Sequence, residues 1–406
     1  MFTSRMSKIE VTTALMALML GSSALVATAA DGVPYENWTS GVKKHDVVSL
    51  PGRHVMHAYY ALDTESPDGR YVLYYTSGTK SGEEGDLRIL ERKTGKETII
   101  AEHIQTEDAH RAACQQWANG GKTIVYHDCR GGKWVVVAVD LATLKQKVLA
   151  EDRQLGFGAT ASIYAPLYGC HWNPGPHRDL EFVNVETGEI KTILTADAIV
   201  GKYAEWTQKR FGGARLSVCF PWISPDGKKV FCKVGKPGWG NSYRGMHVSD
   251  RDGKVIYDIE KREFTRLSMN WGHPSWTPDS TAIFEKGNFA MNVTTGKTVL
   301  FGRSPTDHPT LAPDGKVFAS DGKESKKEKE WVVIVGKAVP AKSSQDSAAY
   351  TIIDKFDNNQ GAASWRRNHP HPVFSADGKR LYYNVNDGPW TRLVVAEAGD
   401  GTSHQP

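Results

Sequence analysis

The sequence has little excess charge of either sign. Its 50 Lys and Arg residues nearly balance 46 Asp and Glu residues, which leaves a formal charge of +4 over 406 residues. It also lacks a basic stripe with interleaved aromatic residues, so nothing in it calls for a nucleic acid partner. The weak positive excess is compatible with an acidic substrate.

A disulfide framework is also absent. The five cysteines are Cys114, Cys129, Cys170, Cys219 and Cys232, an odd number without a short repeated spacing. Cys219 and Cys232 flank one predicted hairpin turn. They are compatible with a bridge, with a zinc pair completed by a histidine of a neighbouring blade, or with two buried thiols.

Long apolar runs are confined to the N-terminus. Residues 11–26 are mostly apolar, Arg5 and Lys8 precede them, and small residues follow at 27–30. This order predicts a signal peptide over residues 1–30. The apolar run is short for a spanning helix and has no later partner. We therefore expect a secreted or periplasmic protein with no membrane contact after cleavage.

A turn motif recurs along the rest of the chain. Clear copies are ESPDG at 65–69, ISPDG at 223–227, WTPDS at 276–280, LAPDG at 311–315 and FSADG at 374–378, and weaker copies are WANGG at 117–121 and WNPG at 172–175. The spacing of roughly 35 to 63 residues, mostly near 50, is typical of four-stranded propeller blades. The sequence thus predicts an all-β, seven-bladed β-propeller as a single domain over residues 31–400. The alternative is a sandwich or a pair of β-domains with coincidental turns.

Other segments fit this ring. Residues 331–336 and 350–355 are strand-like and complete the sixth blade, and residues 196–211 form an amphipathic helical candidate. The run DGKESKKEKE at 321–330 predicts a solvated loop without a function. We expect the segment near Asp46 to pair with the last blade, because closure removes exposed sheet edges.

Histidines occupy equivalent places in the last three blades. His273, His308 and His371 each lie six residues before the turn aspartate and each precede a proline, and His369 lies two residues before His371. Two residues apart in an extended strand, His369 and His371 would share a face. A single such histidine is more often a packed core residue, but four imidazoles converging on one channel predict a site for a divalent metal ion, with manganese, zinc and calcium all open.

Several motifs resemble known polysaccharide lyases. HRAACQQW (110–117), YHDCRGGKW (126–134), YGCHW (168–172) and HRDLEFVNVETG (177–188) resemble the seven-bladed ulvan lyases of the family 24 and 25 type. The segment RNHPHPVFSADGKR (367–380), with DHP one blade earlier, is similar to oligogalacturonate lyase. Both resemblances imply cleavage of a uronic acid polymer by β-elimination.

The ulvan lyase resemblance implies His110, His127, Tyr168 and Arg178 as catalytic residues, with Tyr164 as the rival phenol. His110 or Tyr168 would exchange protons, while Arg178 and His127 would hold the substrate carboxylate. Elimination needs such residue types, because the carboxylate must be neutralised before the proton on C5 can leave.

The oligogalacturonate lyase resemblance implies a divalent ion, usually manganese, at His308, His369 and His371. His273 then falls near the catalytic histidine of that family. The family's glutamine ligand falls near Arg366, which cannot ligate a metal.

We favour the first set, and expect an exported lyase acting on an acidic, sulfated, ulvan-like polysaccharide or its oligosaccharides. The alternatives are a metal-dependent lyase of the oligogalacturonate type and a non-catalytic periplasmic propeller that only binds.

Overall fold

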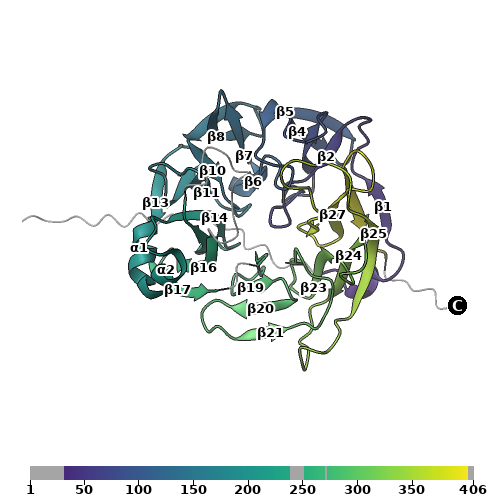
Figure 1. Ribbon diagram of the computed structural model, residues 1–406. Helices are drawn as coiled ribbons and strands as arrows, with labels where there is room; N and C mark the ends of the chain where they lie inside the picture. The colour runs from purple at the N-terminus through teal and green to yellow at the C-terminus, as the bar shows by residue number, and fades with distance from the viewer. Residues whose placement is uncertain (1–31, 238–250, 270–271, 401–406) are drawn as a thin grey trace, which may run out of the picture.

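The structure is a computed structural model that describes residues 32–237, 251–269 and 272–400. The predicted signal peptide lies outside these residues. Within them, the chain forms seven four-stranded antiparallel sheets arranged around a central axis (Figure 1). The prediction of a seven-bladed β-propeller is confirmed, and no described helix is long and apolar enough to span a membrane.

Each blade uses consecutive strands, with the first innermost and the last at the rim (Figure 1). Blades one to three consist of β2 (His54–Met56), β3 (Tyr71–Ser77), β4 (Glu84–Glu91) and β5 (Lys96–Gln105); β6 (Gln116–Ala118), β7 (Thr123–Arg130), β8 (Lys133–Asp140) and β9 (Gln146–Glu151); and β10 (Arg153–Leu155), β11 (Tyr164–Gly169), β12 (Leu180–Asn184) and β13 (Ile190–Leu194).

Blades four to seven continue this order. They consist of β14 (Ser217–Ile223), β15 (Lys229–Gly235), β16 (Arg251–Asp258) and β17 (Glu263–Ser268); β18 (Ser275–Trp276), β19 (Ala282–Glu285), β20 (Phe289–Asn292) and β21 (Thr298–Leu300); β22 (Thr310–Leu311), β23 (Val317–Gly322), β24 (Glu330–Lys337) and β25 (Tyr350–Asp357); and β26 (Val373–Phe374), β27 (Arg380–Val385) and β28 (Arg392–Glu397) with β1 (Lys43–Asp46).

The ring closes as expected. Strand β1 pairs with β28, with Lys43 opposite Glu397 and Asp46 opposite Val394, so the first strand of the chain completes the last blade. This pairing covers the outer edge of β28, which would otherwise be open to another chain.

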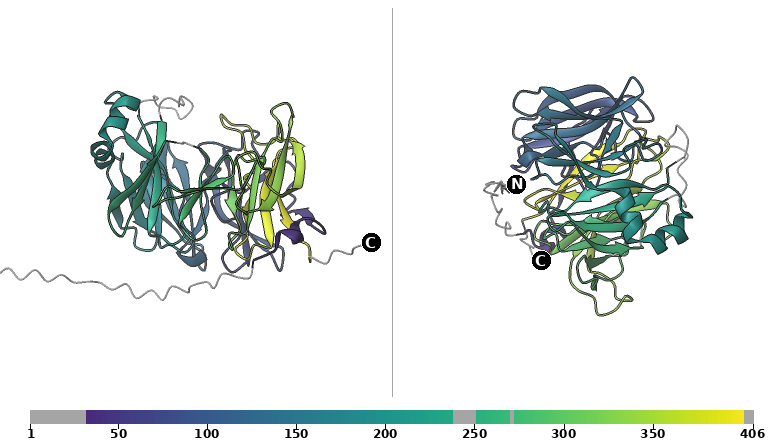
Figure 2. Two further views of the ribbon diagram at one scale, coloured as in Figure 1. Left: turned by 90° about the horizontal axis from the view of Figure 1, so that it is seen from below. Right: turned by 90° about the vertical axis from the view of Figure 1, so that its left-hand side faces the viewer.

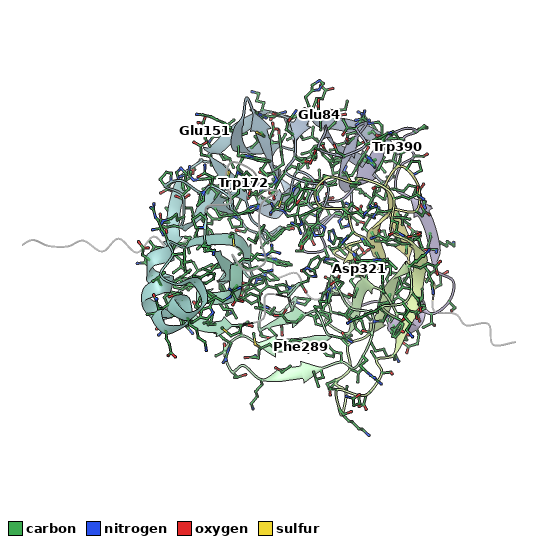
Figure 3. All side chains as sticks on the ribbon, viewed as in Figure 1. Glu84, Glu151, Trp172, Phe289, Asp321 and Trp390 are labelled. Carbon is green, nitrogen blue, oxygen red and sulfur yellow. The ribbon has the colours of Figure 1, made fainter. Side chains whose placement is uncertain are left out.

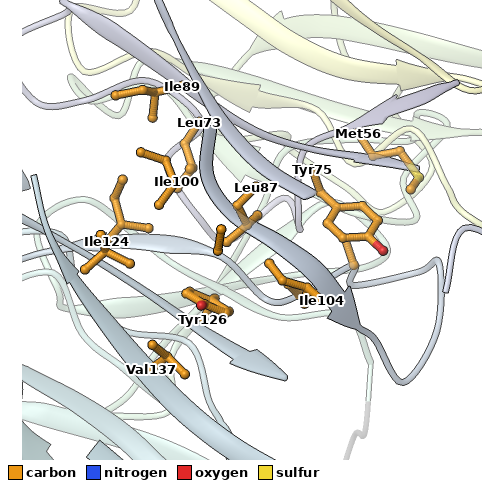
Figure 4. Close-up of a cluster of buried hydrophobic side chains, with 14 of the residues drawn as sticks. Met56, Leu73, Tyr75, Leu87, Ile89, Ile100, Ile104, Ile124, Tyr126 and Val137 are labelled. Atoms are coloured by element: carbon orange, nitrogen blue, oxygen red, sulfur yellow. The ribbon is translucent and has the colours of Figure 1, made fainter. Parts of the chain in front are cut away.

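Apolar side chains between neighbouring blades form the core. Figure 4 shows the cluster between blades one and two, where Leu73 and Leu87 meet Ile124 and Val137. Because each sheet is covered on both faces, its middle strands are apolar on both faces too, as in β8 with the sequence KWVVVAVD.

The recurring turns close the inner hairpins of blades one, four, five and seven by the same Ser- or Thr-to-Asp hydrogen bond. In blade one, Ser66 Oγ donates to Asp68 Oδ1 at 2.6 Å, and Asp68 Oδ1 also accepts from Arg70 N at 3.0 Å. The next residue, Gly69, has φ of +70°, which a glycine adopts without strain. The same Ser-to-Asp bond closes the blade seven turn between Ser375 and Asp377.

Blade three differs from the prediction. The WNPG segment at 172–175 connects β11 to β12, the second and third strands of the blade, and is not its inner turn. The inner strand is β10, and residues 156–163, which lack a Pro-Asp pair, connect it to β11. The prediction that WNPG at 172–175 is the inner turn of blade three is therefore wrong.

The described part of the chain contains the short 3-10 helices η1 (Tyr35–Trp38) and η2 (Asn119–Gly121), the second of which lies in the inner turn of blade two. Two α-helices, α1 (Ala196–Lys202) and α2 (Ala204–Phe211), lie at the rim. They confirm the helical segment predicted at 196–211. Ile199 and Phe211 pack onto blades three and four, outside the ring of sheets (Figure 2).

All five cysteines are free thiols. Cys219 on β14 lies opposite Lys233, so the adjacent Cys232 on β15 points to the other face of the sheet. Both are buried, and no cysteine joins a metal-ligand group in the described residues. Of the three alternatives for Cys219 and Cys232, the structure shows the last, two buried thiols.

Candidate metal centre and pocket

Four histidines meet at one mouth of the ring. His110 lies in the connection between β5 and β6, His308 between β21 and β22, and His369 and His371 between β25 and β26. Each connection runs from the rim of one blade to the inner strand of the next, so all of them lie on the same face of the propeller.

These four residues form a compact group, called here the histidine cluster. Each offers one ring nitrogen, and the four nitrogens lie within 4.8 Å of one another. The ring centroid of His371 is 4.6 Å from that of His110 and 4.4 Å from that of His308. Divalent ions such as zinc bind imidazole nitrogens at about 2.0 to 2.1 Å, so these four residues would hold one ion once their nitrogens draw closer together.

Asp321 orients two members of the cluster. Its Oδ1 accepts from His308 Nδ1 at 2.8 Å and from His308 N at 3.0 Å, and its Oδ2 accepts from His371 N at 3.0 Å. Asp321 is fully buried and lies close to the centre of the ring (Figure 3). Burial raises the pKa of Asp321 to about 7. In its ionised form Asp321 can only accept, so His308 then donates from Nδ1 and its Nε2 carries the lone pair that a metal requires.

The other members also present unpaired nitrogens. His110 donates from Nδ1 to the carbonyl oxygen of Arg367 at 3.0 Å, which leaves Nε2 as the acceptor. His110 Nε2, His308 Nε2, His369 Nδ1 and both ring nitrogens of His371 are buried without a hydrogen-bond partner. Buried polar atoms are rarely left unpaired in proteins, so these nitrogens fit a bound metal ion.

The rings are neutral at physiological pH. Burial lowers the pKa of His308 to about 4 and that of His369 to about 3. Burial and neighbouring positive charges also hold the pKa values of His110 and His371 well below the usual range. Neutral imidazole is the form that binds metals.

His371 has an unusual backbone. Its φ is +51° although Pro372 follows it, so residues 369–371 are not the extended strand that the sequence predicts. Both His369 and His371 nevertheless reach the cluster. A positive φ at a residue other than glycine costs energy and is often found at functional sites.

His273 lies beside the cluster and forms a dyad with an aspartate. Its ring stacks on that of His308 at 4.4 Å, and its Nδ1 donates to Asp307 Oδ1 at 3.1 Å. Lys286 donates to the same Asp307 oxygen at 2.5 Å. Burial lowers the pKa of His273 to about 4. The ring is therefore neutral, with Nε2 as its basic nitrogen.

The dyad borders a pocket with an empty volume of about 510 Å³, part of it open to solvent. Called here the cationic pocket, it is lined by three arginines and by Lys233, whose pKa burial lowers well below its usual value, and, among the described residues, by no carboxylate. Its lining comprises Tyr59, Tyr60, Arg111, Phe157, Phe220, Trp222, Phe231, Lys233, Arg251, His273, Pro274 and Arg366. Such a pocket attracts anions.

Buried polar contacts fix Arg111 in this pocket. Arg111 Nη2 donates to Glu107 Oε2 at 2.5 Å, and Glu107 also meets His171 Nε2 at 3.1 Å. Although burial opposes ionisation, His171 and Arg111 hold the pKa of Glu107 well below its usual range. On the other side of the pocket, Arg366 Nη1 donates to Asp108 at 3.4 Å.

The structure separates the residues of the first predicted catalytic set. His110 belongs to the histidine cluster. His127 and Tyr168 are fully buried on the second strands of blades two and three, where Tyr168 Oη accepts from Arg111 Nη1 at 3.1 Å. Arg178 donates to Leu216 O at 2.7 Å and to Asp197 on α1 at 3.1 Å. None of the four lines the cationic pocket.

Several residues of the site were not predicted. Asp321 was assigned to a solvated loop, but it is buried at the end of β23 and binds two histidines; that prediction is wrong for Asp321. The alternation of β23 (VFASDG) carried a signal, since strand residues continue to position 322. Arg111 comes from the β5–β6 connection, whereas Lys233 and Arg251 come from neighbouring strands of blade four, and no local pattern joins them.

No family model and no curated protein matches the chain. Among solved structures, it is similar to an oligogalacturonate lyase in complex with manganese, with a TM-score of 0.61 and 16% identity over 89% of this chain and 94% of that one. An oligogalacturonate lyase from Vibrio parahaemolyticus gives a TM-score of 0.59 at 16% identity, over 89% and 96% of the two chains. A chain of the mitotic checkpoint complex gives 0.50 at 12% identity, over 98% and 100%. These likenesses support the fold and extend beyond lyases.

Proposed function

We propose that this protein is a metal-dependent lyase that cleaves uronic-acid-containing oligosaccharides or polysaccharides by β-elimination. The observation that carries the proposal is the convergence of four neutral, unpaired histidine nitrogens beside a pocket lined by three arginines and Lys233. The solved oligogalacturonate lyases, one of which holds manganese, add support through the shared fold.

His110, His308, His369 and His371 would hold the ion. Four nitrogen ligands fit zinc or manganese better than calcium, which prefers oxygen ligands. When bound, a divalent ion would neutralise the substrate carboxylate and stabilise the negative charge that develops on it. His110 thus moves from the proton-exchange role suggested by sequence to a ligand role.

His273 would act as the base. Its Nδ1 is bonded to Asp307, which leaves the Nε2 lone pair to accept the proton from C5 of the uronate. The electrons of the C5–H bond form the C4–C5 double bond as the C4–O4 bond breaks. The departing O4 then needs a proton.

Tyr59 would supply that proton. It lines the same pocket, and burial raises its pKa to about 12, so its phenol keeps its proton at neutral pH. Arg111 and Arg366 would hold acidic groups of the substrate in place. Hydrolysis would instead need two opposed carboxylates, and the described lining of this pocket contains none.

Export to the periplasm or the medium, where such polymers occur, is part of the proposal and rests on the N-terminal segment of the sequence. The substrate class is acidic. Ulvan, oligogalacturonate and alginate all carry the required uronate.

The test follows the ultraviolet absorbance of the new C4–C5 double bond. The protein is incubated with ulvan, oligogalacturonate and alginate, each with added manganese or zinc and again after chelation. We expect absorbance with at least one uronate, its loss on chelation and its return with metal. An absence of absorbance with every uronate in the presence of metal refutes the lyase.

A second candidate is a propeller that binds acidic saccharides without cleaving them. The fold is shared with a chain of the mitotic checkpoint complex, which is not named as a lyase, and this supports a propeller that only binds. It predicts saturable binding of the uronates above with no double bond formed. In that case, His273→Gln would leave the binding constant unchanged.

A further inference from the structure

A second pocket opens on the same face of the propeller, over blades two and three. Its empty volume is about 1260 Å³, part of it open to solvent. Called here the side pocket, it is lined by Gln105, Thr106, Cys129, Gly132, Trp134, Asp152, Cys170, Trp172, Asn173, Pro174, Gly175, Pro176 and His177. These residues come from the β7–β8 and β11–β12 connections, from the rim-to-centre connections beside them, and from adjoining strand positions, with Gln105 on β5, Cys129 on β7 and Trp134 on β8. All of these connections lie on the face that carries the histidine cluster.

The lining of the side pocket is aromatic and polar but not cationic. The indoles of Trp134 and Trp172 meet edge to face at 5.6 Å, and Trp134 is partly exposed. The side chains of Gln105 and Asn173 are exposed amides at the rim. Asp152 is the only charged side chain among the described lining residues, and neither Arg nor Lys is present.

This composition selects for one class of ligand. Aromatic rings provide apolar faces for the C–H side of a sugar ring, while amide and carboxylate groups accept and donate hydrogen bonds to hydroxyl groups. A uronate would meet the Asp152 carboxylate without a cation to offset the repulsion. The side pocket therefore differs from the cationic pocket in the charge of the sugar that it fits.

A single buried network separates the two pockets. Thr106 and Trp172 line the side pocket, and their neighbours in sequence, Glu107 and His171, are in contact, with Glu107 Oε1 and His171 Nε2 3.1 Å apart. Glu107 in turn holds Arg111, which lines the cationic pocket. A saccharide chain that crosses this buried network would reach both pockets.

We infer that the side pocket is a binding site for an uncharged sugar unit of a mixed polysaccharide. The link to a polysaccharide rests on the proposed function, but the binding itself does not depend on elimination. The protein would then recognise a chain in which neutral sugars accompany the uronate, rather than a polymer of uronate alone.

Cys129 allows the site to be tested directly. It lines the side pocket and is partly exposed, while the other four cysteines are buried. A maleimide should therefore label Cys129 first, and a sugar seated on Trp134 should block the reagent. The rate of labelling is measured with neutral oligosaccharides of rhamnose, xylose, galactose and arabinose, each at about 10 mM. With a Kd near 1 mM, occupancy slows labelling about tenfold.

We expect at least one neutral oligosaccharide to slow the labelling, and oligogalacturonate not to slow it. Trp134→Ala should abolish the protection. The matched control Trp390→Ala, in the equivalent β27–β28 connection of blade seven, should retain it. Thermal unfolding confirms that both variants are folded. Lack of protection by every neutral sugar, or protection that survives Trp134→Ala, overturns the inference.

The same assay separates this inference from the proposed function. It is run on the metal-depleted protein and on His273→Gln, neither of which should cleave substrate. Protection of Cys129 without any elimination in the wild type would leave the side pocket standing and refute the lyase. Elimination without protection would refute the side pocket alone.

Discussion

Asp321→Asn tests how the fold prepares the histidine cluster. The carboxylate accepts hydrogen bonds from His308 Nδ1, His308 N and His371 N, at 2.8 to 3.0 Å. An asparagine has one oxygen and one NH₂ group in place of two oxygens, so it cannot accept from both histidines. If its oxygen stays on His308, its NH₂ group faces the N–H of His371.

If the amide is reversed, its NH₂ group faces His308 Nδ1 instead. That nitrogen must then become the acceptor, which puts the proton on Nε2 and removes the lone pair aimed at the metal. Loss of a residue that orients a metal ligand typically lowers metal affinity by 10-fold to 100-fold, or about 1.4 to 2.7 kcal/mol. We expect a loss in this range for Asp321→Asn.

The assay is a competition titration of manganese and of zinc against a fluorescent chelator. Asp314→Asn is the control, since Asp314 belongs to the same blade but sits in its inner turn, where it accepts from Lys316 N at 3.0 Å. The control should keep the wild-type Kd. A folded Asp321→Asn protein whose Kd lies within twofold of the wild type would refute the role given to Asp321.

Three further predictions concern the base, a buried ion pair and the response to acid. His273→Gln should lower the rate of elimination by about 10² to 10⁴ while the bound metal is unchanged, as measured by absorbance and elemental analysis. Lys254→Met leaves Glu285 charged and unpaired in a site where both side chains are at most 1% exposed, and should cost about 3 to 5 kcal/mol in urea unfolding. A double variant that also replaces Glu285 with Leu should recover most of this loss. For His54, burial lowers the pKa to about 4, and Nδ1 accepts from Thr391 N at 2.9 Å. Below pH 6.5 the unfolded chain binds a proton at His54 that the native state does not bind. The contribution of His54 to the free energy of unfolding should therefore be lost between pH 6.5 and 4, by at most about 3 kcal/mol, and the total pH dependence should be less steep in His54→Gln.

The ring was predictable because its signals are local. Each Ser-Pro-Asp-Gly turn closes its own hairpin through bonds such as that from Ser66 to Asp68, so the spacing of the blades can be read from the sequence. Blade three shows the limit. Its inner turn has no Pro-Asp pair, and the Pro-Gly turn one strand further on was taken for it.

The candidate site was predictable only in part, because it depends on contacts between blades. His308 and His371 occupy equivalent positions before the turn aspartates of their blades, and His369 lies two residues before His371, so the sequence placed these three together. His110 comes from a connection without the motif, and its approach to His371 depends on the curvature of the whole ring. Asp321 was missed because a charged run follows it, and because the burial of a single carboxylate at a strand end does not change the composition of the segment.

Metal content gives the most direct test of the central claim, that four histidines from three inter-blade connections hold one divalent ion. The purified protein is dialysed against manganese or zinc and its metal is measured by elemental analysis, in parallel with His371→Ala and with His103→Ala, whose side chain is exposed on blade one. The account predicts one ion per chain in the wild type and in His103→Ala, and a loss of most of it in His371→Ala. Equal metal in all three proteins, or none in the wild type, would contradict it.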